Sequence, residues 1–342
     1  MITERALRRR MTPEDRRDMT LSPGPPPWPI PPSWTVTPPR RATATTDPPP
    51  PDTGTAPPPA SAPAPVEQAA PRRTIVLLTT DESTARDVPG IAVEARTPPA
   101  PAAGFAGVYA LADAAARAFA DGAQGVVIVH DDDALDETAW ALDVLHTGEA
   151  PLVLAAGPAG AVDLADALSV AAAAPAGSGC LVVAHGEIHA ARYVRRTGAH
   201  AFSSPGAGPL GRVTAGSARL QWRPPERLTV RGGPAADRTP HVGVHTAVLG
   251  DDGELLGALA ERCDGLVVAG GPLDPIAGTL AAAASRMPVV LASPTGHDAF
   301  TTTSLDPLKA RVLMHLLLAA GRDHDAILSA FAAAEHPGPV QL

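Results

Sequence analysis

Residues 125–154 read GVVIVHDDDALDETAWALDVLHTGEAPLVL and carry the clearest secondary-structure pattern of the chain. It opens with a β-branched run at residues 126–129, which is typical of a strand buried on both faces of a parallel sheet. A helical pattern follows, with Leu135, Leu142 and Leu145 on one side, and the apolar residues 152–154 predict a second strand. The sequence therefore predicts a strand–helix–strand unit, the repeating unit of a parallel α/β sheet.

Polar residues follow the first strand of this unit directly. His130 and three aspartates, Asp131, Asp132 and Asp133, stand at its carboxyl end, where parallel α/β sheets bind their ligands. The residues from Asp133 to Asp136 predict the start of the helix, with a side-chain oxygen accepting backbone N–H groups. Three interpretations of the aspartates stay open: a site for a hard cation, a carboxylate dyad, and a solvated helix start favoured by the helix dipole.

Strand and helix patterns alternate along most of the remaining chain. The predicted elements flanking the central unit are a strand at 74–78, a helix at 107–121, a helix at 162–173 and a strand at 180–183. A stretch rich in Arg, Pro and Gly follows, and then a second series of alternating strands and helices. We therefore predict two α/β domains, at residues 72–218 and 241–342, joined by an irregular linker at residues 219–240.

The first 71 residues have a different composition. They hold about half of the 40 prolines of the chain and almost no aliphatic pattern. Such a segment cannot bury enough apolar surface to offset the entropy that it loses on ordering. We predict that it is a disordered, Pro-rich tail with local polyproline II character.

Charge and cysteine content limit the class of protein. The net charge of −9 lies almost wholly beyond the tail, which argues against a nucleic-acid-binding surface. No apolar run is long enough to cross a membrane, and no apolar segment of a signal peptide follows the first arginines. Cys180 falls in an apolar strand pattern and Cys263 near a helix end, which indicates a reducing compartment without a disulfide framework. We expect a cytoplasmic protein.

The central stretch resembles the region of bacterial L-asparaginases that reads VVxTHGTDTLEETAxxLxLL, with matches at His130, Asp133, Leu135 and residues 137–139. Three later segments match other motifs of that family: residues 180–192 resemble VLVVxxxEIHAARxVxK, residues 202–211 resemble FxSPxxGPLG, and residues 308–313 resemble PxKARxLLxLAL. The resemblance covers residues 74–340. It implies the two-domain asparaginase-like fold, with a larger, mostly parallel N-terminal domain and a smaller C-terminal α/β domain. It also implies a homo-oligomer, a dimer or tetramer, that acts on an asparagine-like small amide without a cofactor or a metal.

The resemblance assigns roles to single residues. Ser83 stands where the nucleophilic threonine of the family's TGGT loop would be, and Asp133 matches the residue that holds the substrate amine. The candidate catalytic residues are Ser83, Asp132 and Asp133, and the candidate substrate-binding residues are Thr80, Thr84, His130 and Asp131.

The departures from the family pattern lie at positions that carry catalytic residues in the family. Asp132 stands where the family has its second catalytic threonine, and the lysine that partners this threonine aligns near Ala174. Asp81 and Glu82 replace the glycines of the TGGT loop, and their charges would oppose that of a tetrahedral intermediate.

Three functions stay open. One is an amidohydrolase that converts L-asparagine to L-aspartate and ammonia through Ser83. A second is a catalytically degenerate relative that acts as a binding or regulatory protein. A third is a hydrolase of another small amide, with Ser83 or Thr84 as nucleophile and Asp132 as base.

Overall fold

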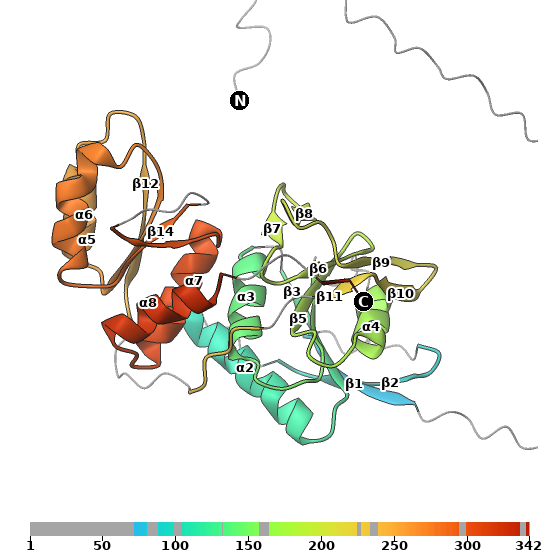
Figure 1. Cartoon of the computed structure of the whole chain (residues 1–342). Coiled ribbons are helices and arrows are strands. Elements are labelled where there is room, and N and C mark those ends of the chain that lie inside the picture. Colours follow the sequence, from blue (N-terminus) through green and yellow to red (C-terminus); the bar gives the residue numbers. More distant parts are fainter. Residues whose placement is uncertain are drawn as a thin grey trace, which may run out of the picture. The chain divides into compact units, whose positions relative to one another are not determined.

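Two main β-sheets, of eight and four strands, follow one another along the chain in the computed structural model of this protein (Figure 1). The structure describes residues 72–80, 88–98, 104–131, 133–156, 164–223, 227–232, 239–293, 299–335 and 340–341. All of them belong to one compact unit. The predicted disordered tail, residues 1–71, lies outside the described residues.

The larger sheet has eight strands in the order β10-β9-β6-β5-β4-β3-β1-β2. Five neighbouring strands are parallel: β1 (Arg73–Leu78), β2 (Ile91–Arg96), β3 (Gly125–His130), β4 (Leu152–Ala156) and β5 (Cys180–Ala184). Three antiparallel strands extend the sheet beyond β5: β6 (Glu187–Ala190), β9 (Gly211–Thr214) and β10 (Ser217–Leu220). The sheet is therefore mostly parallel, as the alternating patterns predict.

Helices cover both faces of this sheet, which is why its central strands are apolar throughout. Three helices do so: α2 (Phe105–Ala120), α3 (Leu135–Leu145) and α4 (Leu164–Ala173). Val126 and Ile128 of β3 pack with α2 and α3, whereas Val127 packs with α4 on the opposite face (Figure 1). Alternate side chains of a strand point to opposite faces, so both sets of residues are buried.

The smaller sheet is wholly parallel. Its strands, in spatial order, are β12 (Val242–Ala247), β13 (Gly265–Gly270), β14 (Val289–Ala292) and β15 (Thr301–Thr303). One face packs against α5 (Glu254–Ala260), the short 3₁₀ helix η2 (Asp274–Ile276) and α6 (Ala277–Ala284). The other packs against α7 (Pro307–Ala319) and α8 (His324–Ala333). The fold is thus a two-sheet α/β fold with the expected larger and smaller parts.

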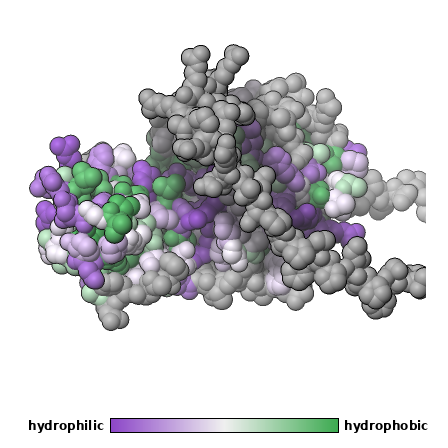
Figure 2. Space-filling view, turned by 90° about the horizontal axis from the view of Figure 1, so that it is seen from above, coloured by the Kyte–Doolittle hydropathy of each residue, from purple (hydrophilic) through white to green (hydrophobic). Residues whose placement is uncertain are grey.

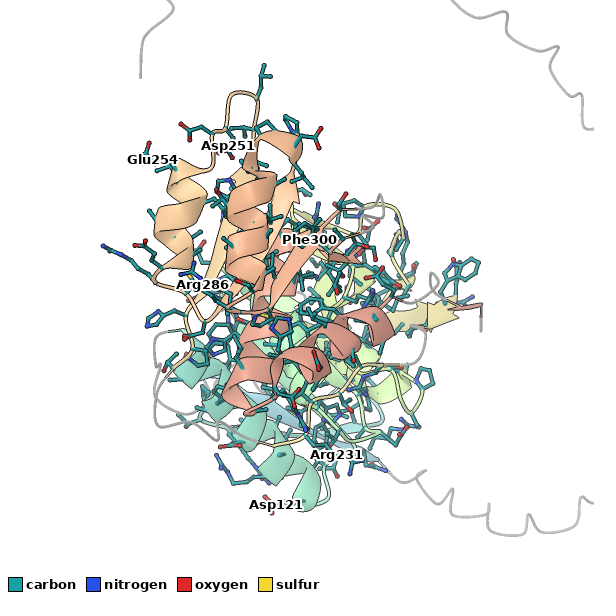
Figure 3. The ribbon with its side chains drawn as sticks, turned by 60° about the vertical axis from the view of Figure 1, so that its left-hand side comes forward. Asp121, Arg231, Asp251, Glu254, Arg286 and Phe300 are labelled. Carbon is teal, nitrogen blue, oxygen red and sulfur yellow. The ribbon has the colours of Figure 1, made fainter. Side chains whose placement is uncertain are left out.

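The surface of the smaller part carries exposed apolar side chains. Val248 and Leu249 follow β12 and are 54% and 94% exposed, and Leu255 of α5 is 77% exposed. Figure 2 shows hydrophobic side chains gathered on the surface of this part. Asp251 and Glu254 mark the end of the α5–α6 pair that lies near this loop, and Arg286 lies at the other end (Figure 3).

Several elements differ from their predicted form. In the smaller part the sequence pattern predicts strands at 241–244, 265–268 and 288–291 and a helix at 275–286. This helix divides into η2 and α6, and β15 has no counterpart among these strands. The range expected as an irregular linker, 219–240, contains the end of β10 and the strand β11 (Trp222–Arg223), which pairs with β16 (Val340–Gln341). These short strands depend on partners far away in the sequence, so a local pattern does not reveal them.

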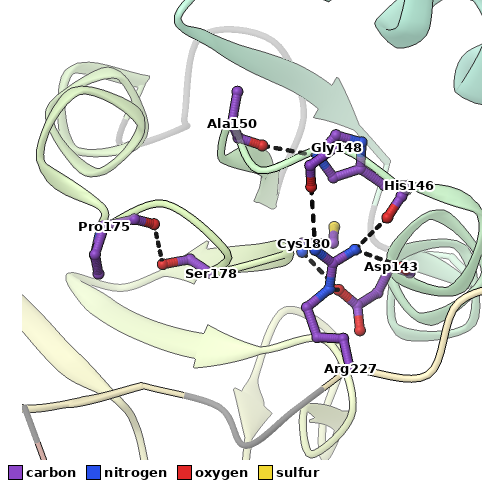
Figure 4. Close-up of polar contacts among 8 residues, drawn as sticks. All are labelled: Asp143, His146, Gly148, Ala150, Pro175, Ser178, Cys180 and Arg227. Carbon is purple, nitrogen blue, oxygen red and sulfur yellow. Dashed lines mark hydrogen bonds and ion pairs between the residues drawn. The ribbon is translucent and has the colours of Figure 1, made fainter.

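A buried ion pair fixes the chain where it leaves the larger sheet (Figure 4). The Arg227 guanidinium donates to Asp143 Oδ1 at 3.1 Å and also to the backbone carbonyls of Asp143 and His146. The same carboxylate oxygen accepts the Cys180 N–H at 2.8 Å. The side chains of Arg227 and Asp143 are only 11% and 10% exposed. This network anchors the segment that starts at residue 227 to α3 and β5.

Helix α7 connects the two sheets through its contact with α3. Trp140 of α3 donates its indole N–H to the carbonyl of Lys309 at 3.0 Å, and both side chains are buried. Apolar residues of α3 and α7 belong to one core cluster that also includes strands of the smaller sheet. Within the described part of the chain, no helix combines the length and apolar character needed to span a membrane.

Candidate functional site

Polar residues meet at the carboxyl edge of the larger sheet. Strand β1 lies beside β3 with Leu78 paired to Ile128, so the chain leaves both strands at the same level. Thr80, just beyond β1, is exposed, and His130 ends β3. The register therefore brings Thr80 and His130 to the same edge of the sheet. Ser83, Thr84 and Asp132, the other candidate residues after these strands, lie outside the described residues.

His130 and Asp131 interact within their own loop. The His130 ring nitrogen Nδ1 lies 2.6 Å from the carbonyl oxygen of Asp131, which makes Nδ1 the donor in this hydrogen bond. The Asp131 side chain is exposed. His130 thus stabilises the turn that follows β3, and its Nε2 is the ring atom that remains for another contact.

The Asp133 carboxylate forms an ion pair with Arg196. Asp133 Oδ1 lies 2.6 Å from Arg196 Nη1, and the two side chains are 90% and 35% exposed. Arg196 belongs to β7 (Arg195–Arg196), which forms a hairpin with β8 (Phe202–Ser203). The hairpin brings a guanidinium to the carboxyl edge from 63 residues further along the chain.

Backbone groups hold the Arg196 guanidinium in place. Its Nε and Nη2 donate to the carbonyls of Gly198 and Ala199 at 3.1 and 2.9 Å. The Arg196 backbone N–H donates to Asp136 Oδ2 at 3.2 Å, so the hairpin touches the first turn of α3 as well. The guanidinium is therefore held by the backbone of its own hairpin as well as by the ion pair with Asp133.

The start of α3 differs from its predicted form. Ala134, not an aspartate, is the N-cap residue; it has φ 54° in the left-handed region, and no side chain caps the helix there. Asp136 Oδ1 accepts the Glu137 N–H at 3.1 Å, while Asp133 points to Arg196. Helix α3 therefore starts within the predicted residues 133–136, but the accepting side chain is Asp136, whereas the Asp133 carboxylate pairs with Arg196. A left-handed alanine costs roughly 1–2 kcal/mol.

A cation lies beside these aspartates. The alignment of the family's lysine near Ala174 had indicated that the site lacks one. Ala174 follows α4 and is buried, and the neighbouring carbonyl of Ala172 accepts Arg73 Nη1 at 2.6 Å. Arg73 begins β1, so this end of α4 lies at the amino edge of the sheet, away from the site. The cation at the site is Arg196. Its signal in the sequence was the final lysine of the VLVVxxxEIHAARxVxK pattern, which falls on Arg196.

Two comparisons with known sequences place the chain in a family. The family described as "Asparaginase, N-terminal" matches residues 99–226. A protein of Deinococcus radiodurans named probable L-asparaginase is 32% identical over 249 residues, which are 62% of this chain and 76% of the relative. The chain belongs to the asparaginase family.

Further relatives agree with the asparaginase assignment. A probable periplasmic L-asparaginase of Haemophilus influenzae is 32% identical over 242 residues, which cover 60% of this chain and 69% of the relative. The crystal structure of a probable cytoplasmic L-asparaginase from Campylobacter jejuni has a TM-score of 0.63 at 24% identity, and covers 77% of this chain and 99% of its own. At this identity the structure supports the asparaginase fold alone.

Polar contacts with α7 support the hairpin that carries Arg196 in this asparaginase-family chain. Arg195, its neighbour, forms an ion pair with Asp306, which also caps α7 by accepting the Leu308 N–H at 2.9 Å. Lys309 of α7 is 1% exposed and donates from Nζ to the Ala191 carbonyl. Burial lowers the pKa of Lys309 to about 7. Helix α7 therefore fixes the chain just before β7.

A serine–histidine pair elsewhere in the larger part is structural. Ser204 Oγ lies 3.0 Å from His189 Nδ1, and His189 Nε2 lies 3.5 Å from the Glu187 carboxylate. The order of groups matches that of a catalytic triad. His189 is 0% and Ser204 6% exposed, however, so a substrate cannot reach the hydroxyl. Burial also lowers the pKa of His189, which keeps the ring neutral.

The described part of the chain offers no group of three or more His, Cys, Asp or Glu side chains placed to hold a metal ion. At the carboxyl edge the described charged groups include the carboxylates of Asp131, Asp133 and Asp136 and the Arg196 guanidinium. Such a set can orient a small polar molecule through charge-assisted hydrogen bonds. Arginine stays protonated in proteins, so Arg196 can hold a negative charge but cannot remove a proton from a hydroxyl group.

Proposed function

We propose that the carboxyl edge of the larger sheet binds a small asparagine-like amide and that the chain does not hydrolyse it at the rate of an active asparaginase. The observation that carries the proposal is the 2.6 Å ion pair between Asp133 and Arg196. Asp133 matches the residue that would hold a substrate ammonium group. A guanidinium already occupies that partner position, so an amino-acid ligand has to compete with Arg196.

The chemistry of the neighbouring positions supports the loss of catalysis. Asp132 lacks the hydroxyl of the threonine that it replaces, and the matching cation is an arginine that cannot act as a base. Asp81 and Glu82 replace glycines in the first loop and would oppose a developing oxyanion. Catalytic groups act as a unit, so losses of this kind together leave little rate enhancement.

The second candidate function is hydrolysis of L-asparagine to L-aspartate and ammonia, with Ser83 as nucleophile. The names of two relatives that are each 32% identical, both probable L-asparaginases, favour it. Thr80 lies just beyond β1 and is exposed, and the hydroxyls of Ser83 and Thr84 follow it in the sequence. Hydrolysis of another small amide would use Ser83 or Thr84, with Asp132 as base.

Ammonia release and ligand binding, measured on the same protein, separate these functions. We expect L-asparagine to bind in isothermal titration calorimetry without ammonia release above that of the Ser83→Ala variant. Ammonia release that disappears in Ser83→Ala would replace our proposal with the asparaginase function. Release that survives Ser83→Ala but is lost in Thr84→Ala would favour the other small-amide mechanism. Absence of binding would refute the proposed ligand.

The Arg196→Ala variant tests the ion pair directly. Removing the guanidinium leaves the Asp133 carboxylate available to a ligand ammonium, so we expect L-asparagine to bind several-fold more tightly. Arg212→Ala is a matched control, because Arg212 pairs with Glu187 at 2.5 Å on the surface of the same sheet. Equal affinities in the wild type and Arg196→Ala would show that Asp133 does not contact the ligand.

We also infer that the chain forms homo-oligomers in the cytoplasm. The exposed apolar residues Val248, Leu249 and Leu255 support a contact with a second copy, because a surface of this kind is typical of an interface. Leu249→Glu combined with Leu255→Glu should lower the mass measured by light scattering during gel filtration. Arg286→Glu, at the far end of the α5–α6 pair, should leave it unchanged. The free thiols of Cys180 and Cys263 are consistent with a reducing compartment.

A further inference from the structure

A cavity of about 360 Å³ lies at the amino edge of the smaller sheet, apart from the carboxyl edge of the larger one. Its walls come from four elements. They are the start of β12 with the residues before it, the end of α5, the middle of α7 and the first residue of α2. The cavity is open to solvent on one side and is much larger than a single inorganic ion requires.

The charged groups of the cavity are cationic. Arg262, just beyond α5, and Arg311 of α7 both line it, together with His241. None of the described lining residues is an aspartate or a glutamate. Arg311 has its acidic neighbour outside the cavity, since its Nη1 lies 3.6 Å from Glu137 Oε2. Within the part of the chain that the structure describes, no carboxylate lies within ion-pair distance of the Arg262 guanidinium.

The apolar wall of the cavity is flat and uncharged. The rings of Phe105 and His315 are stacked with centroids 3.4 Å apart and planes inclined by 7°. His315 Nδ1 lies 3.2 Å from the Pro240 carbonyl oxygen, which holds the ring in the stack. Burial, Arg311 and His241 lower the pKa of His315 to about 4, so the ring is neutral near pH 7. Leu259 and Val242 complete the apolar surface.

We propose that this cavity binds a small organic acid, whose carboxylate or phosphate group pairs with Arg262 and Arg311 and whose apolar body lies along the Phe105–His315 stack. Guanidinium groups are well suited to bind both oxyanions in a bidentate manner. A partly enclosed site strengthens such pairs relative to the open surface. The site is separate from the proposed amide site, and nothing in its function requires hydrolysis.

Cysteine labelling provides a test that does not depend on activity. Cys263 lines the cavity and is partly exposed, whereas Cys180, the other of the 2 cysteines, is 1% exposed in β5. N-Ethylmaleimide is uncharged, so its reaction with Cys263, followed by mass spectrometry, reports access to the cavity. Benzoate and phenyl phosphate are the anionic probes, benzamide is the uncharged probe, and chloride keeps the ionic strength constant.

We expect both anionic probes to slow the labelling of Cys263 several-fold and in a saturable manner, and benzamide to have a much smaller effect. Arg262→Gln should remove most of this protection without affecting folding, because the side chain is exposed. Arg286→Gln is the matched control: Arg286 is also exposed and lies beyond the end of the neighbouring helix α6, outside the cavity (Figure 3). Protection should persist in this variant.

Three results would overturn the proposal. Equal protection by benzamide and benzoate would show an apolar cavity without anion recognition. Equal protection in Arg262→Gln and the wild type would place the anion elsewhere. Failure of both anionic probes to slow the labelling, or failure of the reagent to reach Cys263 at all, would show that the cavity does not admit such a molecule. Protection by benzoate alone or by phenyl phosphate alone would support the proposal and select between the two anions.

Discussion

Two of the Asp–Arg pairs of the molecule, Asp143–Arg227 and Asp133–Arg196, lie in very different surroundings. Asp143 and Arg227 are about nine-tenths buried, and each also forms hydrogen bonds with backbone groups. Asp133 and Arg196 lie at the carboxyl edge, where the aspartate is 90% exposed. A buried charge cannot lose its partner without a large penalty, whereas water readily replaces an exposed partner. The first pair therefore serves the fold, and the second is placed where a ligand can exchange with it.

The largest expected effect comes from breaking the buried pair. Asp143→Ala leaves the Arg227 guanidinium and the Cys180 N–H without their acceptor, so we expect a loss of about 3–5 kcal/mol in the free energy of unfolding. Urea unfolding followed by circular dichroism measures it. Asp121→Ala is the control, since Asp121 pairs with Arg96 at 2.7 Å while 59% exposed, and should cost less than about 1 kcal/mol. Equal losses in the two variants would remove the distinction between buried and exposed pairs.

Lys309 is another buried ionisable group, and its burial should make the free energy of unfolding depend on pH. Its pKa is lowered from 10.5 to about 7, so between these values the unfolded chain binds a proton that the folded chain lacks. The free energy of unfolding should therefore rise with pH above about 7, by up to about 1.4 kcal/mol per unit, with the full penalty present below that pH. Lys309→Met should remove this part of the slope in urea titrations between about pH 7 and about pH 9. Identical slopes in the two proteins would contradict the assignment.

Relief of backbone strain at Ala134, beside Asp133, should have a smaller effect on the free energy of unfolding. Ala134→Gly removes the Cβ from a left-handed residue, and the relief of about 1–2 kcal/mol is partly offset by the greater chain entropy of glycine. We expect a net gain of roughly 0.5–1 kcal/mol in thermal or urea unfolding. Ala281→Gly, at an exposed position of α6, should instead lose about 1 kcal/mol. A loss of stability in Ala134→Gly would show that the turn does not strain the chain.

The smallest expected change in stability belongs to the exposed pair itself. Arg196→Ala should alter the free energy of unfolding by less than about 1 kcal/mol, because water solvates the released carboxylate. The effect should fall further as salt is added, since salt screens exposed charges. A loss as large as that of Asp143→Ala would make Arg196 part of the fold and would weaken its role as a competitor for the ligand.

Strong local patterns predicted the fold well. The run Val126 to Val129 predicted β3 because both faces of that strand are covered. The spacing of Leu135, Ala139 and Leu142 predicted α3 because the buried face of a helix repeats every third or fourth residue. Strand β15 lacked such a signal, since three threonines carry no apolar run. Strand β11 was missed because its partner β16 lies at the far end of the chain.

The candidate site was predictable only in part. The register of β1 and β3 brings Thr80 and His130 to one edge, and neighbouring strands in the sequence made that arrangement foreseeable. Arg196 was missed because a hairpin delivers it from a distant segment, and the alignment near Ala174 pointed to the wrong edge of the sheet. The left-handed Ala134 has no local signature, because alanine normally avoids that conformation.

The contact between Trp140 and Lys309 has an optical consequence. The chain has 4 tryptophans, and Trp140 is buried with its indole N–H bonded across the contact between α3 and α7. Its fluorescence should be shifted to short wavelength relative to that of Trp222, which is 38% exposed. A spectral shift of Trp140 emission therefore marks the moment at which α7 separates from α3, and it distinguishes that event from changes at the surface.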